Sequence, residues 1–485
     1  MINTEVKDID GQTATHVAAT FGRDVTVKFL GAEKENEINQ IDDAGRTPLH
    51  LASKNGHKET VTTLLSLGAE THIKDCSGCS PLHTAVMFNY LDVVKILSVK
   101  DNILNEKTSV VGLTPLHIAT KLGNMEMIKY FLLKGADVNA KTLADSKDNN
   151  GLTALHHAAN FGHSSVVENL IRKRIDIQAQ STCLTTALHM AAQAGHEQVV
   201  KILLSAGANV HSTDEGGSTA LHFSAGNGHD AISEALIMKG ANVNCKDSNK
   251  ITPLYEAATK ACNEKNILLL LNNGALVNEI EGLGVTALHV SSFVGNSSVV
   301  EALLKGNADG NARTTFGITA LGLAVRGNHK ATVEILLEHG VSIDLLDSTG
   351  DSALCIAARN NNKDLLDFLI TKGADVNFGH RHIVEALLKN KDVDINIKDR
   401  DGSNLLYAAA VSGDVLIARE LIKRGIQVAD CLQNPSPLYM AMLLGHTEFV
   451  KVLLESGTNV NPMDPNLSPL YLAIQMNNPE VMESL

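Results

Sequence analysis

The sequence predicts an all-α solenoid in which helix–turn–helix units stack in single file. Three observations carry this prediction. A motif of the form Thr/Ser-Pro/Ala-Leu-His-x-Ala recurs along the 485 residues, its fourth position returns mostly after 33 or 34 residues, and each copy carries the same helix start and stop signals. That fourth position, which we name the signature position, falls at residues 16, 50, 83, 117, 156, 189, 222, 255, 289, 322, 355, 407, 439 and 471.

Each unit presents its elements in one order. An Asp-x-x-Gly turn comes first, as at Asp42–Gly45, because Asp can bond its own backbone and Gly accepts a positive φ. Thr47 and the proline after it then begin a first helix, the hydroxyl capping free N–H groups. Gly56 suits the left-handed residue that ends this helix. A second helix follows with apolar residues at helical spacing, such as Val200 and Leu204, and it closes on Gly-Ala-x-Val-Asn.

Composition narrows the class of protein. With 44% hydrophobic and 20% charged residues the chain can bury a core, and with no Trp and 4% aromatic residues that core must be aliphatic. A net charge of -13 disfavours nucleic acid as a partner, since phosphate binding needs cations. The start has no export signal, and the longest aliphatic run, Ile267–Leu271, is too short to cross a bilayer. Seven scattered Cys fit a reducing compartment, so we expect a cytoplasmic chain without direct membrane insertion.

The repeated motif resembles that of the ankyrin repeat family, with matches such as Thr47-Pro-Leu-His-Leu-Ala and Thr114-Pro-Leu-His-Ile-Ala. The resemblance covers the whole chain, as about fourteen signature-bearing repeats plus one truncated unit. It implies stacked helix pairs with β-hairpin fingers in a curved, elongated superhelix, roughly 110 to 140 Å long at the usual helix spacing. It also implies a concave face of fingers and first helices as the default binding surface. The family performs many unrelated jobs, so the resemblance predicts the fold more strongly than the function.

The signature position divides the chain into segments. It is His in all of the first seven units and, in the last seven, only at His289. We expect this His to bridge neighbouring units through both ring nitrogens, which Tyr, Gly or Cys cannot do, so the second half should be looser or differently curved. The sequence therefore predicts regular repeats 1–7 over 1–250, degenerate repeats 8–11 over 251–372, a truncated unit with a possible kink over 373–402, and repeats 12–14 over 403–485, the last incomplete.

Two steps between signature positions are irregular. The 39-residue step from 117 to 156 contains a polar insertion around Leu143–Lys147, which predicts a longer loop. The 52-residue step from 355 to 407 lacks a finger and a first helix, which indicates either a true kink or, as the favoured interpretation, a spliced or mispredicted gene segment. Residues 378–398 should then be the weakest point of the stack. At the end of the chain, Val481, Met482 and Leu485 have no following unit to cover them, so we expect a longer protein.

The His and Cys residues that could carry chemistry are explained by their positions in the repeat. His72, Cys76, Cys79 and His83 have a spacing that would suit four zinc ligands, but His83 is a signature residue and the cysteines flank a turn. Most of the twenty His occupy signature positions or follow a Gly between helices. Leu–Asn pairs such as Leu303 and Asn311 resemble the family's pattern for asparagine hydroxylation, although core packing and hairpin anchoring explain both residues. We expect no catalytic residue, cofactor, metal or small-molecule substrate.

The fingers hold the candidate partner-binding residues. Just before the helix-capping Thr, several fingers carry an apolar residue that could form an exposed stripe or simply pack on the next finger: Leu113, Leu152, Ile251, Val285 and Ile318. Acidic residues at the tips would favour a partner with basic segments: Asp43, Asp148, Asp214, Glu215 and Asp247.

The leading hypothesis is a non-enzymatic scaffold or adaptor that binds a protein partner on this face. One alternative is the ankyrin segment of a larger membrane, channel or latrotoxin-like protein. Another is the substrate-recruiting part of an enzyme such as a ligase or kinase.

Overall fold

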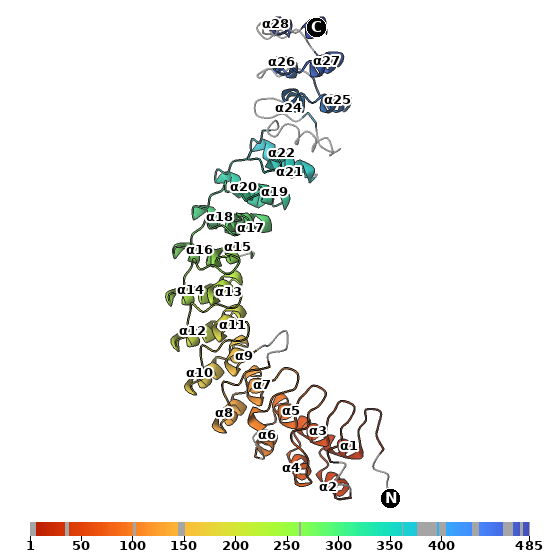
Figure 1. The fold of residues 1–485 in the computed structure, drawn as a ribbon, viewed down its shortest axis with the longest axis vertical. Coiled ribbons are helices and arrows are strands. Elements are labelled where there is room, and N and C mark those ends of the chain that lie inside the picture. The colour runs from red at the N-terminus through yellow and green to blue at the C-terminus, as the bar shows by residue number, and fades with distance from the viewer. Residues whose placement is uncertain are drawn as a thin grey trace. The chain divides into compact units, whose positions relative to one another are not determined.

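The computed structural model describes residues 6–33, 38–99, 103–143, 151–260, 263–360, 362–375, 395–396, 404–428, 436–458, 469–475 and 479–484 (Figure 1). In these ranges every extended regular element is a helix, which confirms the all-α prediction. The chain forms two compact units, Met1–Ser248 and Asn249–Leu485. The truncated segment 378–398, Asp148 and Leu485 lie largely or wholly outside the described residues, as does most of the Leu143–Lys147 insertion.

The first unit is a series of helix pairs. Its first helices are α1 (Ala14–Thr20), α3 (Pro48–Asn55), α5 (Pro81–Met87), α7 (Pro115–Lys121), α9 (Ala154–Asn160), α11 (Ala187–Ala194) and α13 (Ala220–Gly226). Its second helices are α2 (Asp24–Glu33), α4 (Lys58–Ser66), α6 (Leu91–Leu97), α8 (Met125–Leu133), α10 (Ser164–Arg172), α12 (Glu197–Ser205) and α14 (Asp230–Met238), with a short 3-10 turn, η2 (Ile103–Asn105), after α6. Figure 1 shows the first helices along one side of this unit and the second helices along the other.

The second unit continues the same plan. Its first helices are α15 (Pro253–Ala258), α17 (Ala287–Val294), α19 (Ala320–Arg326), α21 (Ala353–Arg359), α24 (Leu405–Ser412), α26 (Pro437–Leu443) and α28 (Pro469–Gln475). Its second helices are α16 (Glu264–Asn272), α18 (Ser297–Lys305), α20 (Lys330–Glu338), α22 (Lys363–Thr371), α25 (Val415–Lys423), α27 (Thr447–Glu455) and α29 (Pro479–Ser484). No helix in the described ranges is long and apolar enough to cross a membrane.

Local chemistry sets the ends of the helices. Thr47 has an extended backbone and its hydroxyl accepts the His50 N–H, while Pro48 takes the first helical position, where no N–H is needed. Gly56 ends α3 with φ 74°, a left-handed conformation that side chains with a Cβ rarely adopt. The sequence analysis predicted both signals.

The fingers are tight turns rather than β-hairpins with full strands. Asp42 shows the turn chemistry: its Oδ1 accepts the Ala44 N–H (3.0 Å) and the Arg46 N–H (2.8 Å). Extended pairing in the described residues is limited to single bridges, Thr213–Thr219 and Arg313–Thr319. The expected β-hairpins are thus shorter than the resemblance implied, because one or two residues on each side of the turn leave room for only one bridge.

Successive finger tips are tied to one another by backbone hydrogen bonds. The Asp43 N–H donates to the Asp10 carbonyl (3.1 Å), and the Cys76 N–H donates to the Ala44 carbonyl (2.9 Å). Equivalent bonds join Ser109 to Gly78, Glu215 to Cys183, Ser248 to Gly216, Thr315 to Leu283 and Ser348 to Phe316. Each finger therefore takes its position from the finger before it.

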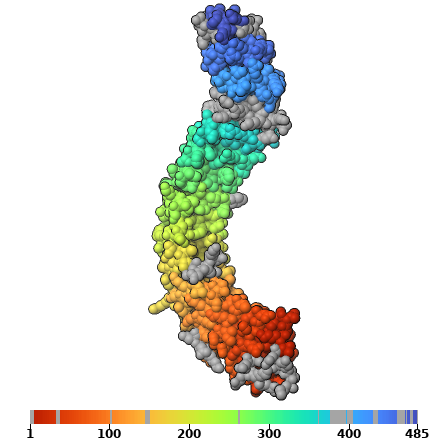
Figure 2. Space-filling view, turned by 45° about the vertical axis from the view of Figure 1, so that its right-hand side comes forward, coloured from red at the N-terminus to blue at the C-terminus, as the bar shows by residue number. Residues whose placement is uncertain are grey.

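The core lies between consecutive helix pairs and is mainly aliphatic, as the composition predicted. Within the first unit, the first helices from α1 to α11 each pack on the first helix of the next pair, as α9 does on α11. In both units the first helices also pack on their own second helices. Phe131 and Phe449 are the bulkiest fully buried side chains in the described ranges, and most of the others are Leu, Ile and Val. Figure 2 shows the described repeats of the first unit in continuous contact on the face in view. In a stack of this kind, the stability of each repeat comes from its contacts with neighbouring repeats.

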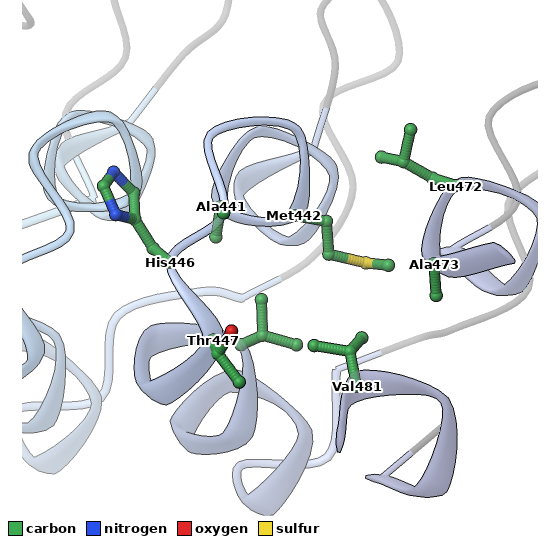
Figure 3. A pocket seen from close by; sticks show the side chains of 9 residues that line it. Ala441, Met442, His446, Thr447, Leu472, Ala473 and Val481 are labelled. Atoms are coloured by element: carbon green, nitrogen blue, oxygen red, sulfur yellow. The ribbon is translucent and has the colours of Figure 1, made fainter. Parts of the chain in front are cut away.

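The last described repeats pack in the same manner (Figure 3). Met442 of α26, Ala473 of α28 and Val481 of α29 point toward a common apolar space of about 10 Å³, which is too small for a ligand. Val481 is buried and Met482 is half-buried. The expectation that Val481 lacks cover is therefore wrong, because α27 and α28 already supply it.

Candidate protein-binding surface

Where it is present, the signature histidine hydrogen-bonds to the residue that caps the start of the first helix. In the second repeat, Nδ1 of His50 accepts the Thr47 N–H (3.1 Å) and lies 2.9 Å from the Thr47 hydroxyl. Because a backbone N–H can only donate, Nδ1 is the acceptor and the ring proton is on Nε2. The same arrangement recurs at His16, His83, His117, His156, His189, His222 and His289.

The other ring nitrogen reaches the next repeat. Nε2 of His50 donates to the Cys79 carbonyl (3.0 Å), which lies just before the capping residue of the following helix. Equivalent bonds run from His16 to Arg46 (2.9 Å), His83 to Leu113 (3.1 Å), His117 to Leu152 (3.2 Å), His156 to Thr185 (3.0 Å), His189 to Ser218 (3.2 Å) and His289 to Ile318 (3.2 Å). The predicted bridging by both ring nitrogens is confirmed at these positions.

Burial keeps these rings neutral. Loss of hydration lowers the pKa of His83, His117 and His156 to about 4, because the charged form cannot be solvated inside the stack. Burial also lowers the pKa of His16, His50, His189 and His289. A neutral ring is the form that can accept at Nδ1 and donate at Nε2 together.

A second row of histidines binds backward to the preceding repeat. His196, which follows Gly195 between α11 and α12, donates from Nε2 to the Asn160 carbonyl (2.9 Å). The same bond is made by His57, His163, His229, His329 and His446. The sequence analysis treated the Gly-His steps as repeat architecture, but it missed His329 because Asn328 replaces the glycine there, with φ 60°. Helix pairs that carry both histidines, such as α9–α10 and α11–α12, are thus tied to their neighbours on both sides.

The second unit replaces most signature histidines, and each replacement changes the chemistry. Cys355 is fully buried and its thiol accepts from the Ser352 hydroxyl (3.4 Å). Tyr255 is half-buried, and burial together with Glu281 and Glu256 raises its pKa to about 12. At Gly322 there is no side chain, although its N–H still donates to the Thr319 hydroxyl (3.1 Å).

Restoring the signature residue with Gly322→His is expected to raise the free energy of unfolding of the second unit by roughly 1 kcal/mol. The gain combines helix propensity with one net hydrogen bond from the new imidazole to the next repeat. A Cβ at Gly322 would meet Ile356 Cδ1 at 3.4 Å, an ordinary contact, so the backbone admits the change. Urea denaturation followed by circular dichroism measures the shift, and a lower midpoint for the variant would contradict it.

The structure places the predicted apolar finger residues at the root of each finger. Leu152 is buried, at 6% exposure, and the expectation of an exposed stripe therefore does not hold for its side chain. Leu113, Ile251, Val285 and Ile318 are half-buried. The carbonyls of several of these residues accept the histidine bonds described above, which accounts for the inward position. Their assignment to partner binding stays a prediction.

The predicted acidic residues fall into two groups. Asp43 and Glu215 are exposed at finger tips, whereas Asp214 and Asp247 are half-buried. Oδ1 of Asp214 accepts the Ser218 N–H (2.8 Å), so this carboxylate also shapes its turn. Their role in binding a basic partner stays a prediction too.

The first helices expose apolar side chains that were not predicted from the sequence. They lie at the carboxyl ends of α1, α5, α7 and α9, at or next to the helix cap: Phe21 (66% exposed), Phe88 (47%), Leu122 (51%) and Phe161 (43%). The ammonium groups of Lys54 and Lys121 lie over the rings of Phe88 (5.5 Å) and Phe161 (5.8 Å). All four fall five residues after a signature position, a spacing that the sequence already contained. We call the surface formed by the fingers and these helix ends the finger face.

The His–Cys string in the third repeat is used by the fold. Nε2 of His83 donates to the Leu113 carbonyl, and burial raises the pKa of the Cys79 thiol to about 11. His72 is exposed and lies 3.3 Å from a Glu70 carboxylate oxygen. Among the described residues, no group of three or more His, Cys, Asp or Glu is placed to hold a metal ion.

The chain is similar to curated proteins that carry out different tasks. It is 28% identical over 104 residues to target of rapamycin complex 2 subunit AVO2 of Saccharomyces cerevisiae, covering 20% of this chain and 24% of that protein. It is 36% identical over 98 residues to human transient receptor potential cation channel subfamily A member 1 (20% and 9%), and 32% identical over 116 residues to mouse Rabankyrin-5 (21% and 10%). The chain thus spans about a quarter or less of the length of these relatives.

A solved structure and a family profile are also similar to the chain. The ankyrin repeat domain of human ASB11 matches with 26% identity and a TM-score of 0.42, covering 47% of this chain and 98% of that chain. The profile described as ankyrin repeats (3 copies) matches residues 1–75, 67–142, 142–214, 188–281, 221–314, 288–379, 376–464 and 427–485, which together span the whole length. Since the profile matches repeats along the whole chain and the structure forms stacked helix pairs at the described ones, this protein belongs to the ankyrin repeat family.

Proposed function

We propose that this chain is a non-enzymatic scaffold or adaptor that binds a protein partner on its finger face. Ankyrin repeats are in general protein–protein interaction modules, and their fold is typically non-catalytic. The observation that carries the proposal is the set of exposed apolar helix ends, Phe88, Leu122 and Phe161, on consecutive repeats. Large apolar side chains held in a row on a preformed scaffold mark protein interaction sites, because binding there costs little ordering entropy.

The finger tips add charge to this surface. Asp43 and Glu215 are exposed and would favour basic segments of the partner, while the ammonium groups of Lys54 and Lys121 lie over the rings of Phe88 and Phe161. The half-exposed finger residues Leu113, Ile251, Val285 and Ile318 would extend the contact toward the finger roots. Cys76, Cys79, Cys183, Cys245 and Cys355 carry free thiols, which supports a reducing compartment such as the cytoplasm.

The test is affinity capture with two matched triple variants. One replaces Phe88, Leu122 and Phe161 by Glu on the finger face. The other replaces Val25, Leu133 and Met238 by Glu on the second helices, where the side chains are 76%, 78% and 77% exposed. We expect the finger-face variant to lose about tenfold or more of the captured partner, roughly 1.4 kcal/mol of binding free energy, and the second-helix variant to retain it. Equal capture by both variants, or selective loss with the second-helix variant, would contradict the proposal.

A second candidate is that these repeats are the ankyrin segment of a larger membrane, channel or latrotoxin-like protein. The short coverage of the relatives favours it, since the chain spans only 9% of the human cation channel that it resembles in part. The intact open reading frame decides between the two: a membrane-spanning or pore-forming segment beside these repeats supports this candidate, and a stop codon directly after them opposes it.

A further inference from the structure

The finger face of the second unit contains a groove at the repeat that lacks a signature side chain. The groove lies between α19 and α21 and beneath their two fingers, and its volume is about 290 Å³. Phe316 and Ile318 of one finger, Gly322 and Arg326 of α19, Asp351 of the next finger and Arg359 of α21 line it. That volume is about ten times the space that one water molecule takes in the liquid. The groove is therefore wide enough for a large side chain.

The missing imidazole accounts for the hollow. In the repeats that keep the signature histidine, a buried ring fills the space between the first helix and the next finger and donates to the carbonyl before the next cap. At Gly322 the ring and its donor are both absent, while the helix start is preserved by the bond to Thr319. Glycine is not required by a left-handed backbone there. The groove is thus the space that a flat ring with a hydrogen-bond donor fills in the other repeats.

Asp351 holds the position whose carbonyl accepts from the signature histidine in other repeats. It lies 29 residues after Gly322, as Ile318 does after His289, and its carbonyl accepts the Asp347 N–H (3.0 Å). The residue is 5% exposed, and its Oδ2 pairs with Arg359 and accepts from the Thr349 hydroxyl (3.2 Å). Its Oδ1 is buried and has no hydrogen-bond partner among the described residues. The carboxylate is therefore enclosed, and the acceptor on this residue that corresponds to the one used by the signature histidines is its backbone carbonyl.

Arg326 leaves a free positive charge at the rim of the same groove. Its side chain is exposed, and no described residue forms an ion pair with it. Arg359, in contrast, is committed to Asp351. Phe316 is exposed beside these groups and offers an apolar ring for stacking. A partner segment with a carboxylate next to an aromatic side chain would pair the carboxylate with the Arg326 guanidinium and place the aromatic ring in the groove.

We propose that this groove receives a partner-protein segment that places an aromatic side chain with a ring N–H, next to a carboxylate, into the space left by the missing histidine. The ring N–H donates to the Asp351 carbonyl, the ring lies against Phe316 and Ile318, and the partner's carboxylate pairs with Arg326. This inference rests on the proposed function and names the partner chemistry at one place on the finger face. Buried aromatic anchors of this kind dominate the binding energy of protein interfaces.

The experiment is a titration of the full chain, labelled at the isoleucine δ1 methyl groups, observed by methyl NMR. The probe is a short synthetic peptide that contains a glutamate followed by a tryptophan; a glutamine–tryptophan peptide and free N-acetyltryptophan are the comparisons. We expect the first peptide to shift the methyl signals of Ile318 and Ile356, which both line the groove, and the glutamine peptide to bind about tenfold more weakly.

Two variants make the result specific. Gly322→His fills the hollow with the family's own ring and should abolish the shifts while the chain stays folded. Arg326→Gln should weaken binding of the glutamate peptide about tenfold and leave the affinity for the glutamine peptide unchanged. Arg172→Gln, on α10 of the first unit, is the matched control and should bind as the wild type does.

Three outcomes would overturn the inference. The methyl signals of Ile318 and Ile356 do not move at millimolar peptide, or the Gly322→His variant binds the glutamate–tryptophan peptide as tightly as the wild type does. The third is that N-acetyltryptophan binds as tightly as this peptide. A chain that captures no protein from a lysate but binds the peptide would contradict the proposed function alone. A chain that captures a partner but leaves these methyl signals unmoved would contradict this inference alone.

Discussion

Replacing His156 by alanine is expected to lower the free energy of unfolding of the first unit by roughly 3 kcal/mol. The imidazole is fully buried, its Nδ1 accepts the Thr153 N–H (3.1 Å), and its Nε2 donates to the Thr185 carbonyl (3.0 Å). The substitution removes the ring from a packed interface and leaves a backbone N–H and a carbonyl without their partners. The midpoint of urea denaturation, followed by circular dichroism, measures the change.

His196→Ala is the matched control. His196 also joins two repeats through one Nε2 bond to a carbonyl (2.9 Å), but its ring is partly exposed, so water can replace the lost bond. We expect a loss of about 1 kcal/mol or less. If the two variants were equally destabilised, burial of the signature ring would not be the source of its contribution.

The repeat could be predicted from the sequence because its signals are local. Thr47, Pro48 and Gly56 each act within one or two turns of helix, and the role of His50 follows from the two nitrogens of its ring. The groove at Gly322 could not be predicted, because it depends on how α19 and α21 pack once a ring is missing. Sequence analysis identified the substitution but interpreted it as looseness. For Leu152 the sequence left two positions open, an exposed stripe or packing on the next finger. The structure has the buried position, where the Leu152 carbonyl accepts from a histidine of the preceding repeat.

Acid is expected to unfold the first unit before the second. Seven histidines of the first unit have a lowered pKa, mainly through burial: His16, His50, His83, His117, His156, His157 and His189. In the second unit, where most signature positions are not histidine, burial lowers the pKa of His289. In the unfolded chain these rings take up a proton near pH 6.5, whereas in the folded chain His83, His117 and His156 do so only near pH 4.

The unfolded state therefore binds more protons across this window, so the stabilisation is complete above pH 6.5 and is lost as the pH falls from 6.5 toward 4. A change in pKa from 6.5 to about 4 corresponds to roughly 3 kcal/mol of unfolding free energy for each histidine. The contributions of neighbouring histidines will not add fully. Limited proteolysis at pH 4.5 and at pH 7, with cleavage sites identified by mass spectrometry, measures the order of unfolding. Earlier cleavage in the second unit at pH 4.5 would contradict this expectation.

His157→Leu gives an internal check on the acid transition. Burial and its histidine neighbours lower the pKa of His157 to about 3, and its Nε2 is buried without a hydrogen-bond partner among the described residues. Equivalent positions in other repeats hold Leu51, Ile118 and Met190. The variant should move the acid midpoint of the first unit to lower pH, because it removes a group that protonates only on unfolding. An unchanged midpoint would show that His157 does not contribute to acid unfolding.

The central claim is that each repeat draws its stability from its immediate neighbours, through shared core and the histidine bonds between them. Hydrogen–deuterium exchange of the wild type and His156→Ala, compared helix by helix at neutral pH, tests it most directly. Faster exchange should be confined to α7–α12, with α3 and α4 in the first unit and α17–α20 in the second unchanged. A loss of protection spread evenly over every helix would contradict the claim, because it would mean that the chain unfolds as one cooperative body.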